Sequence, residues 1–269
     1  MKKGGFAPFF NIPRHFPMSR LKFASHYALR HLLISLCFAL ATAAFVFLVL
    51  YPSPFSALLG IVSIYAILMT ADVVCGPLLT LILASPQKSR RERWMDFSLI
   101  GGLQIAALAF GLYSVWIARP VVLGFEIDHL AVVTANEIET EALPKAPPGM
   151  QSLPWIGMMK VSTRKPRNQQ EFIDSVALEM SGVTASMRPD WWQPWSEAKE
   201  SINQHARPVA ELVARRPQDA AALQTAVDKS GLPLAQLRYL PLSSSKTKEW
   251  VIFLDQNLQI AGAAHVDGF

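Results

Sequence analysis

The sequence predicts a membrane protein of the α-helical class, with three transmembrane helices followed by an α+β domain that contains a small antiparallel sheet. Hydrophobic residues make up 51% of the chain and charged residues 17%, which is too apolar for an ordinary soluble protein of 269 residues. Three apolar runs reach the roughly 20 residues that a helix needs to cross a bilayer. Patterns rich in β-branched residues, typical of strands, follow the third run.

The predicted spans fill the N-terminal part of the chain. Their expected bounds are residues 29–51, 55–84 and 97–118, within a transmembrane region of residues 29–119; a tail covers residues 1–28 and the α+β domain covers residues 120–269. The second run is longer than one span requires. We therefore expect it to tilt, or to lay its first turn along the membrane interface.

Lysine and arginine predict the orientation of these helices. These basic residues cluster before the first span and between the second and third spans, whereas the turn at residues 51–55 carries no charge. The chain up to Arg119 holds eleven basic and three acidic residues. The rest of the chain holds fourteen basic and seventeen acidic residues. The N-terminus is therefore expected inside and the α+β domain outside. The basic balance reflects membrane topology and does not indicate nucleic-acid binding.

One segment of the second run places a carboxyl group inside a membrane span. Asp72, Gly76 and Thr80 recur at helical spacing and share one face, while Pro77 beside Gly76 is expected to kink the helix. An ionised Asp at bilayer depth costs roughly 2.5–3.5 kcal/mol on insertion scales. Asp72 should therefore face protein or water.

The third run carries a matching stripe of small and polar residues. Gly101, Gln104 and Gly111 recur at short helical intervals, and such stripes allow helices to approach closely. We expect the Asp72 carboxyl group to hydrogen-bond with Gln104 or with a helix of another protein. A structural bond within the bundle and a role in partner docking fit this pattern equally well.

The α+β domain should build its sheet from both of its ends. Strand patterns lie in residues 121–133 and 237–265, helices are expected after Asn168, over 196–205 and 208–215 and from Pro217, and residues 137–158 form a Pro-rich linker. Trp191, Trp192 and Trp195 are either a partner-binding patch, a membrane-lying wedge or part of the core, and the core is favoured.

No pattern in the sequence predicts catalysis, a cofactor or a metal site. His129, His205 and His265 are far apart and lack ligand spacing. Both cysteines, Cys37 and Cys75, lie within spans, so no disulfide framework is expected. Asp96 is expected to cap the third helix. A membrane enzyme would need a second carboxylate or a His beside Asp72, and the pattern offers neither.

Several segments resemble the TfpX/TfpZ-type type IV pilin accessory proteins. They are MSRLK at 18–22, YPSP at 51–54, DVVCGPLLTL at 72–81, QIAALAFGLY at 104–113 and ARPV at 118–121. The resemblance is close over about residues 18–138 and returns near the C-terminus, whereas about 140–235 has no match. Residues 1–17 precede the usual start, which makes Met18 a candidate initiator, and Cys75 replaces an expected aliphatic residue.

The resemblance implies a non-enzymatic accessory factor in the cytoplasmic (inner) membrane of a Gram-negative bacterium, with a cytoplasmic N-terminus and a periplasmic C-terminal domain. Such a protein assists or modulates the assembly of its cognate major type IV pilin, with the pilus assembly machinery and membrane lipids as further partners. The expected partner-binding residues are Asp72, Gly76, Pro77, Thr80, Gly101, Gln104, Gly111, Trp191, Trp192 and Trp195. The alternative is a membrane-anchored periplasmic sensor that binds an envelope ligand.

Overall fold

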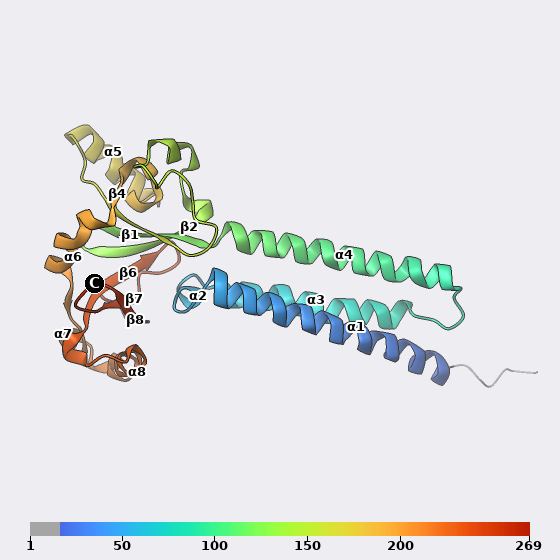
Figure 1. Cartoon of the computed structure of the whole chain (residues 1–269). Coiled ribbons are helices and arrows are strands. Elements are labelled where there is room, and N and C mark those ends of the chain that lie inside the picture. Colours follow the sequence, from blue (N-terminus) through green and yellow to red (C-terminus); the bar gives the residue numbers. More distant parts are fainter. Residues whose placement is uncertain (1–16) are drawn as a thin grey trace, which may run out of the picture. The chain divides into compact units, whose positions relative to one another are not determined.

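The computed structural model describes residues 17–269, so residues 1–16 of the predicted tail lie outside the described residues. The rest of the predicted tail, residues 17–28, is wrong, because it forms the first turns of a helix that begins at Pro17. The chain divides into two compact units. The membrane unit comprises Ala66–Gly111 with the described chain up to Ala41, and the domain unit comprises Thr42–Tyr65 with Leu112–Phe269. Figure 1 labels their helices and strands.

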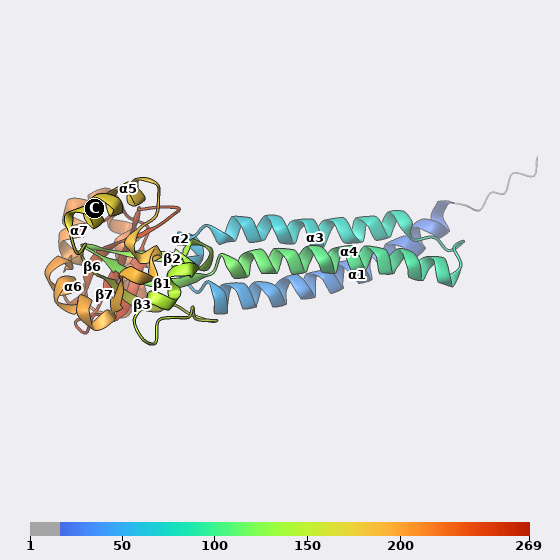
Figure 2. The same ribbon diagram turned by 90° about the horizontal axis from the view of Figure 1, so that it is seen from above.

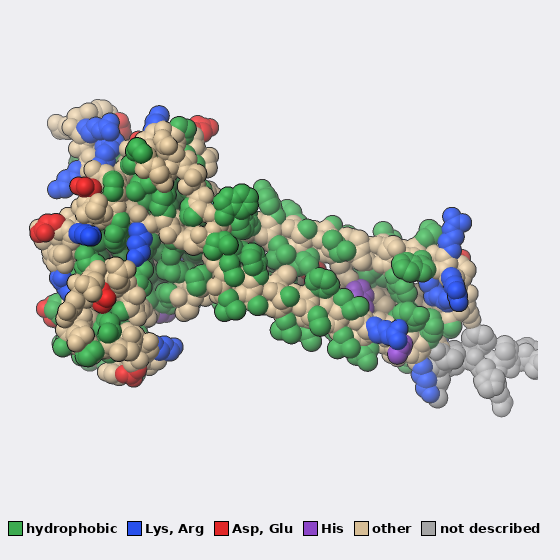
Figure 3. All heavy atoms as spheres, viewed as in Figure 1, with side chains coloured by type: hydrophobic (Ala, Val, Ile, Leu, Met, Phe, Trp, Pro, Cys, Tyr) green, Lys and Arg blue, Asp and Glu red, His purple; other side chains and the backbone are tan. Residues whose placement is uncertain are grey.

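Within residues 17–269, three helices are long and apolar enough to cross a membrane. They are α1 (Pro17–Phe45), which the π-helical turn Val46–Leu50 continues, α3 (Ile61–Leu83) and α4 (Arg90–Ile117). Their parts in the membrane unit run side by side (Figure 2). Hydrophobic side chains cover their outward surfaces (Figure 3), as a hydrocarbon environment requires. The prediction of long apolar helices ahead of an α+β domain is confirmed.

The excess length of the second apolar run forms a separate turn. The short helix α2 (Phe55–Leu58) occupies its start, and Gly60 separates α2 from α3. Gly60 has a φ of +65°, a left-handed conformation that glycine adopts without steric cost. Beyond it, α3 is one continuous helix that contains Pro77.

Ser89 and Glu92 cap the start of α4. The Glu92 N–H donates to Ser89 Oγ at 3.2 Å, and the Ser89 N–H donates to Glu92 Oε2 at 2.7 Å. The prediction that Asp96 caps this helix is wrong, because the reciprocal bonds of Ser89 and Glu92 start the helix earlier. Asp96 lies inside α4 and pairs with Lys88 at 2.6 Å.

The domain unit contains one mixed sheet of eight strands, in the order β4-β3-β1-β2-β6-β7-β8, with β5 paired to β6. The strands are β1 (Pro120–Glu126), β2 (His129–Thr134), β3 (Met159–Thr163), β4 (Trp192–Pro194), β5 (Arg207–Pro208), β6 (Arg238–Ser244), β7 (Trp250–Leu254) and β8 (Ile260–Ala264). The two ends of the domain meet where β2 lies beside β6.

The prediction of a small antiparallel sheet is wrong in the size of the sheet and in the direction of two strand pairs. β1 pairs with β3 in parallel, and β2 pairs with β6 in parallel. Parallel strands require long connections, and a long stretch of chain separates the partners in both pairs. The pairs joined by short turns, β1–β2, β6–β7 and β7–β8, are antiparallel. Strand β3 follows the predicted linker directly, in the part of the domain that sequence patterns describe least.

Four helices of the domain unit occupy the predicted regions. They are α5 (Gln169–Met180), α6 (Lys199–His205), α7 (Val209–Arg215) and α8 (Ala220–Ser230). The Asn168 side chain caps α5 by accepting the Glu171 N–H at 2.8 Å. Gly231, with a φ of +68°, ends α8 in the left-handed conformation.

The core of the domain unit includes the following two groups of buried side chains. One joins α7 and α8 to the sheet and includes Val209, Leu212, Leu223, Tyr239 and Phe253. The other surrounds β1 and β3 and includes Val121, Val122, Val133, Val161 and Trp192. Every residue of β1 is buried, as expected for a central strand with a parallel neighbour.

A methyl group at Gly124 of β1 should destabilise the domain. A Cβ there would lie 2.6 Å from the Cβ of the fully buried Ser186, so the backbone would have to shift. We expect Gly124→Ala to lower the free energy of unfolding by about 1–3 kcal/mol. Gly262→Ala is the control, because its nearest contact is an ordinary 3.6 Å. Equal thermal midpoints for the two variants in detergent would contradict this prediction.

Candidate functional site

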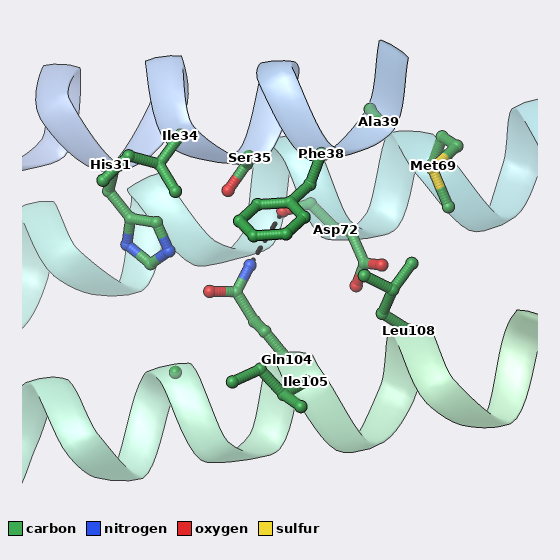
Figure 4. A pocket seen from close by; sticks show the side chains of 11 residues that line it. His31, Ile34, Ser35, Phe38, Ala39, Met69, Asp72, Gln104, Ile105 and Leu108 are labelled. Carbon is green, nitrogen blue, oxygen red and sulfur yellow. Dashed lines mark hydrogen bonds between the residues drawn. The ribbon is translucent and has the colours of Figure 1, made fainter. Parts of the chain in front are cut away.

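Three of the predicted intramembrane residues, Asp72, Gly101 and Gln104, line a cavity of about 210 Å³ in the membrane unit (Figure 4). Its lining comes from α1 (His31, Ile34, Ser35, Phe38, Ala39), α3 (Met69, Asp72) and α4 (Gly101, Gln104, Ile105, Leu108). The lining is mostly apolar, with a few polar groups that converge on one region. This composition is typical of a pocket that binds another molecule.

The Asp72 side chain has no partner among the described residues. Its Oδ2 atom is buried and makes no hydrogen bond there. Gln104 Nε2 donates instead to the main-chain oxygen of Asp72 at 2.9 Å (Figure 4). Gln104 therefore contacts the predicted residue of α3, but the predicted bond to its carboxyl group is wrong, because the main-chain oxygen accepts instead. A buried polar atom without a partner is costly, and such atoms concentrate at functional sites.

Gly76 explains why the Gln104 amide group reaches the main chain of α3. A Cβ at position 76 would overlap that amide group, so the absence of a side chain creates its place. Gly111 acts similarly, because a Cβ there would overlap the side chain of Leu68. The two glycines allow α3 and α4 to approach closely.

Thr80 connects α3 to α1. Its side chain is buried, and its Oγ1 lies 2.6 Å from His31 Nδ1. His31 was not among the predicted site residues, since a lone His at the start of an apolar run gives no recognisable signal. Gly101, by contrast, lines the cavity and has open space where a Cβ would be. The predicted stripe therefore divides into residues engaged in helix contacts and residues that border the cavity.

Two of the three predicted tryptophans belong to the core of the domain unit. Trp191 is buried, with Arg164 and Arg188 positioned over its ring at 4.5 and 4.6 Å. Trp192 is also buried and donates its indole N–H to the Ser186 main-chain oxygen at 2.8 Å. A partner could reach neither ring without rearrangement of the domain.

The remaining tryptophan lies at the surface of the same unit. Trp195 is half-buried, with the Lys160 ammonium group 5.9 Å from its ring centre. It is thus the member of the three that a partner could contact directly.

Helix α5 presents an exposed apolar face that the sequence analysis did not identify as a surface feature. Its large apolar side chains Phe172, Ile173, Val176 and Met180 are exposed, and the helix has no buried residue. The spacing of these residues predicts a helix but does not tell whether its apolar face is covered. We call this surface the α5 face.

One ion pair fixes the start of α5. Arg164 Nη2 donates to Glu171 Oε1 at 2.6 Å, and the Arg167 N–H also donates to Glu171. These bonds favour the ionised form and lower the pKa of Glu171 to about 2. Arg164 thereby links α5 to the buried Trp191 ring.

The described residues contain no group of three or more His, Cys, Asp or Glu side chains that could hold a metal ion. Cys37 and Cys75 are free thiols.

The three candidate membrane spans among the described residues indicate a membrane protein with a soluble C-terminal domain. The family model described as fimbrial assembly protein FimB matches residues 19–60. Fimbrial assembly proteins of Dichelobacter nodosus serogroups E1 and I are each 35% identical over 254 residues, covering 93% of this chain and 98% of theirs. The chain belongs to this family of fimbrial assembly proteins.

A shorter relative matches part of the chain. The fimbrial assembly protein of D. nodosus serogroups C1 and C2 is 39% identical over 127 residues, covering 47% of this chain and 97% of that protein. No solved structure matches the chain.

Gly76→Ala should weaken the contact between α3 and α4. The added methyl group displaces the Gln104 amide group from the Asp72 carbonyl, which costs about 1 kcal/mol in a typical hydrogen bond. Gly102→Ala, with open space at its Cβ position, is the control. The measurement is the thermal midpoint of the protein in detergent. Because this destabilisation by Gly76→Ala acts through Gln104, it should be smaller in a Gln104→Ala background. An equal loss of thermal stability in that background would contradict the role of Gln104.

Proposed function

We propose that this protein is a non-enzymatic accessory factor of type IV pilus assembly that acts on its cognate major pilin. Membership of the fimbrial assembly family carries the proposal. The resemblance to TfpX/TfpZ-type pilin accessory proteins narrows it to type IV pili. The family match also favours this function over the alternative of an envelope sensor.

The proposal includes a location in the cytoplasmic membrane of a Gram-negative bacterium, with the N-terminus in the cytoplasm and the C-terminal domain in the periplasm. The distribution of charge supports this orientation. The basic residues Arg20, Lys22 and Arg30 lie near the start of α1, and Lys88, Arg90, Arg91 and Arg93 lie between α3 and α4 or in the first turn of α4.

The membrane part of the pilin is proposed to dock over the cavity around Asp72. Gly76, Thr80 and Gly111 are engaged in contacts between the helices, so they shape the bundle and do not offer a free surface. Asp72 and Gly101 border the cavity, whose apolar rim includes the exposed side chains of Ile34 and Ile105. A helix of the pilin can cover this rim and donate a hydrogen bond to the Asp72 carboxyl group. This bond would satisfy the buried oxygen atom that has no partner.

The periplasmic head of the pilin is proposed to meet the α5 face. An exposed apolar stripe on an otherwise polar helix is suited to binding another protein. Trp195 offers a further aromatic contact on the domain unit. Two contacts with one pilin strengthen its binding, because the first contact raises the effective concentration of the pilin at the second binding surface.

Photocrosslinking tests the docking site in the membrane. A photoreactive residue at Ile105, which is 70% exposed and borders the cavity, should form an adduct with the major pilin in piliated cells. Leu103 is the control, because it is 65% exposed but lies about 200° around α4 from Ile105. Asp72→Asn should weaken the adduct at position 105, since it alters the hydrogen-bonding capacity of the cavity while keeping the shape of the side chain. Equal adducts from positions 105 and 103 would exclude the cavity as the docking site.

A second measurement tests the α5 face. Val176→Ser should weaken binding of the full-length protein to the purified pilin head by about tenfold, as loss of a central apolar contact costs roughly 1–2 kcal/mol. Asp174→Ser is the control, because residue 174 lies about 160° around the same helix. The role of the α5 face is disproved if both variants bind the head as tightly as the unaltered protein.

A further inference from the structure

The loop ahead of β3 carries two large apolar side chains at its tip. Trp155 is 78% exposed and Ile156 is 62% exposed. The surrounding residues, 151–158, include no acidic or basic side chain. A neutral loop with an exposed Trp and Ile is unusual on a surface that faces only water. We call residues 151–158 the Trp155 loop.

Contacts of Leu153 and Pro154 hold the Trp155 loop in place ahead of its tip. Leu153 packs against the buried group around β1 and β3, and the Pro154 main-chain oxygen accepts from Arg119 Nη2 at 2.9 Å. Gly157 has a φ of +75°, which turns the chain back towards β3. The tip therefore projects from fixed supports.

The same contacts place the tip at the end of a membrane span. Trp116 lies in the last turn of α4, and the Trp155 ring centre is 5.6 Å from its own. The Arg119 guanidinium group stacks over the Trp116 ring at 4.1 Å and donates to the Trp116 main-chain oxygen at 3.0 Å. Arg119 thus joins the end of α4 to the loop.

A second residue, Tyr51, independently indicates where the membrane interface lies. Tyr51 follows the π-helical turn that ends the first span, and its hydroxyl group donates to the Val115 main-chain oxygen at 2.9 Å. Trp and Tyr at the ends of spans are typical of the interface between hydrocarbon and lipid headgroups. Trp155 lies against Trp116, so it reaches this interface as well.

We propose that Trp155 and Ile156 insert into the headgroup region of the membrane, so that the Trp155 loop is a lipid anchor of the domain unit. Trp suits this position, because its apolar ring enters the lipid while its N–H group stays near polar atoms. The occupant is the bilayer that surrounds α4, since the loop continues the aromatic surface at the end of this span. The anchor goes beyond the proposed function and requires only that the helices cross a membrane.

Site-directed spin labelling tests the anchor in the full-length protein. Cys37 and Cys75 are replaced by Ser, Ile156→Cys carries the label, and the protein is reconstituted without pilin into vesicles of phosphatidylethanolamine and phosphatidylglycerol. Oxygen concentrates in lipid, whereas a charged nickel chelate stays in water. We expect the ratio of oxygen accessibility to nickel accessibility at position 156 to be severalfold higher than at the control position.

Ile127→Cys is the matched control. Ile127 is 77% exposed and lies beyond the far end of β1, roughly 20 Å from the start of that strand. The same accessibility ratio at positions 156 and 127 would overturn the anchor. Spectral broadening at position 156 that disappears on dilution with unlabelled protein would also overturn it, because a second copy of the chain would then cover the loop.

Discussion

Lipid offers no hydrogen bonds, and this constraint governs the placement of polar groups on the three membrane helices. His31 pairs with Thr80, Thr42 with Tyr65, and Gln104 with a main-chain carbonyl. Each pair joins two helices, so satisfying a polar group also fixes a helix contact. Among the described residues of these helices, Asp72 differs, because its Oδ2 atom is buried without a hydrogen-bond partner.

The sequence predicts the helices well, because the length of an apolar run and the spacing of small residues are local properties. The expected contact between α3 and α4 is present at Gly76 and Gln104. The predicted bond between Gln104 and the Asp72 carboxyl group is wrong, because the main-chain oxygen of Asp72 accepts it instead. The accepting atom depends on how far the Gln104 side chain extends along the α3 backbone. The engagement of Thr80 by His31 depends on the relative rotation of α1 and α3, which periodicity does not determine.

In the domain unit, local sequence patterns predict some features of the fold but not others. Its hairpins and helices follow from turns, caps and spacing, but the parallel pairings β1–β3 and β2–β6 join segments far apart in the chain. Phe172, Val176 and Met180 have the spacing of a core-facing helix, yet they are exposed. Periodicity reveals that a helix has an apolar face but does not reveal what covers it. Tertiary packing also decides which tryptophans are buried. Two arginines lie over the ring of Trp191, whereas Trp195 lies at the surface.

The junction between α4 and the sheet has a consequence for how the protein meets its partners. The helix ends at Ile117, β1 begins at Pro120, and Arg119 is buried between them with its main-chain oxygen bonded to the Ala135 N–H. A flexible tether would let a domain sweep a volume that grows with tether length. Here the tether is absent, so the first strand of the sheet follows the last turn of α4 directly. A partner therefore meets β1 and the end of α4 as one continuous element.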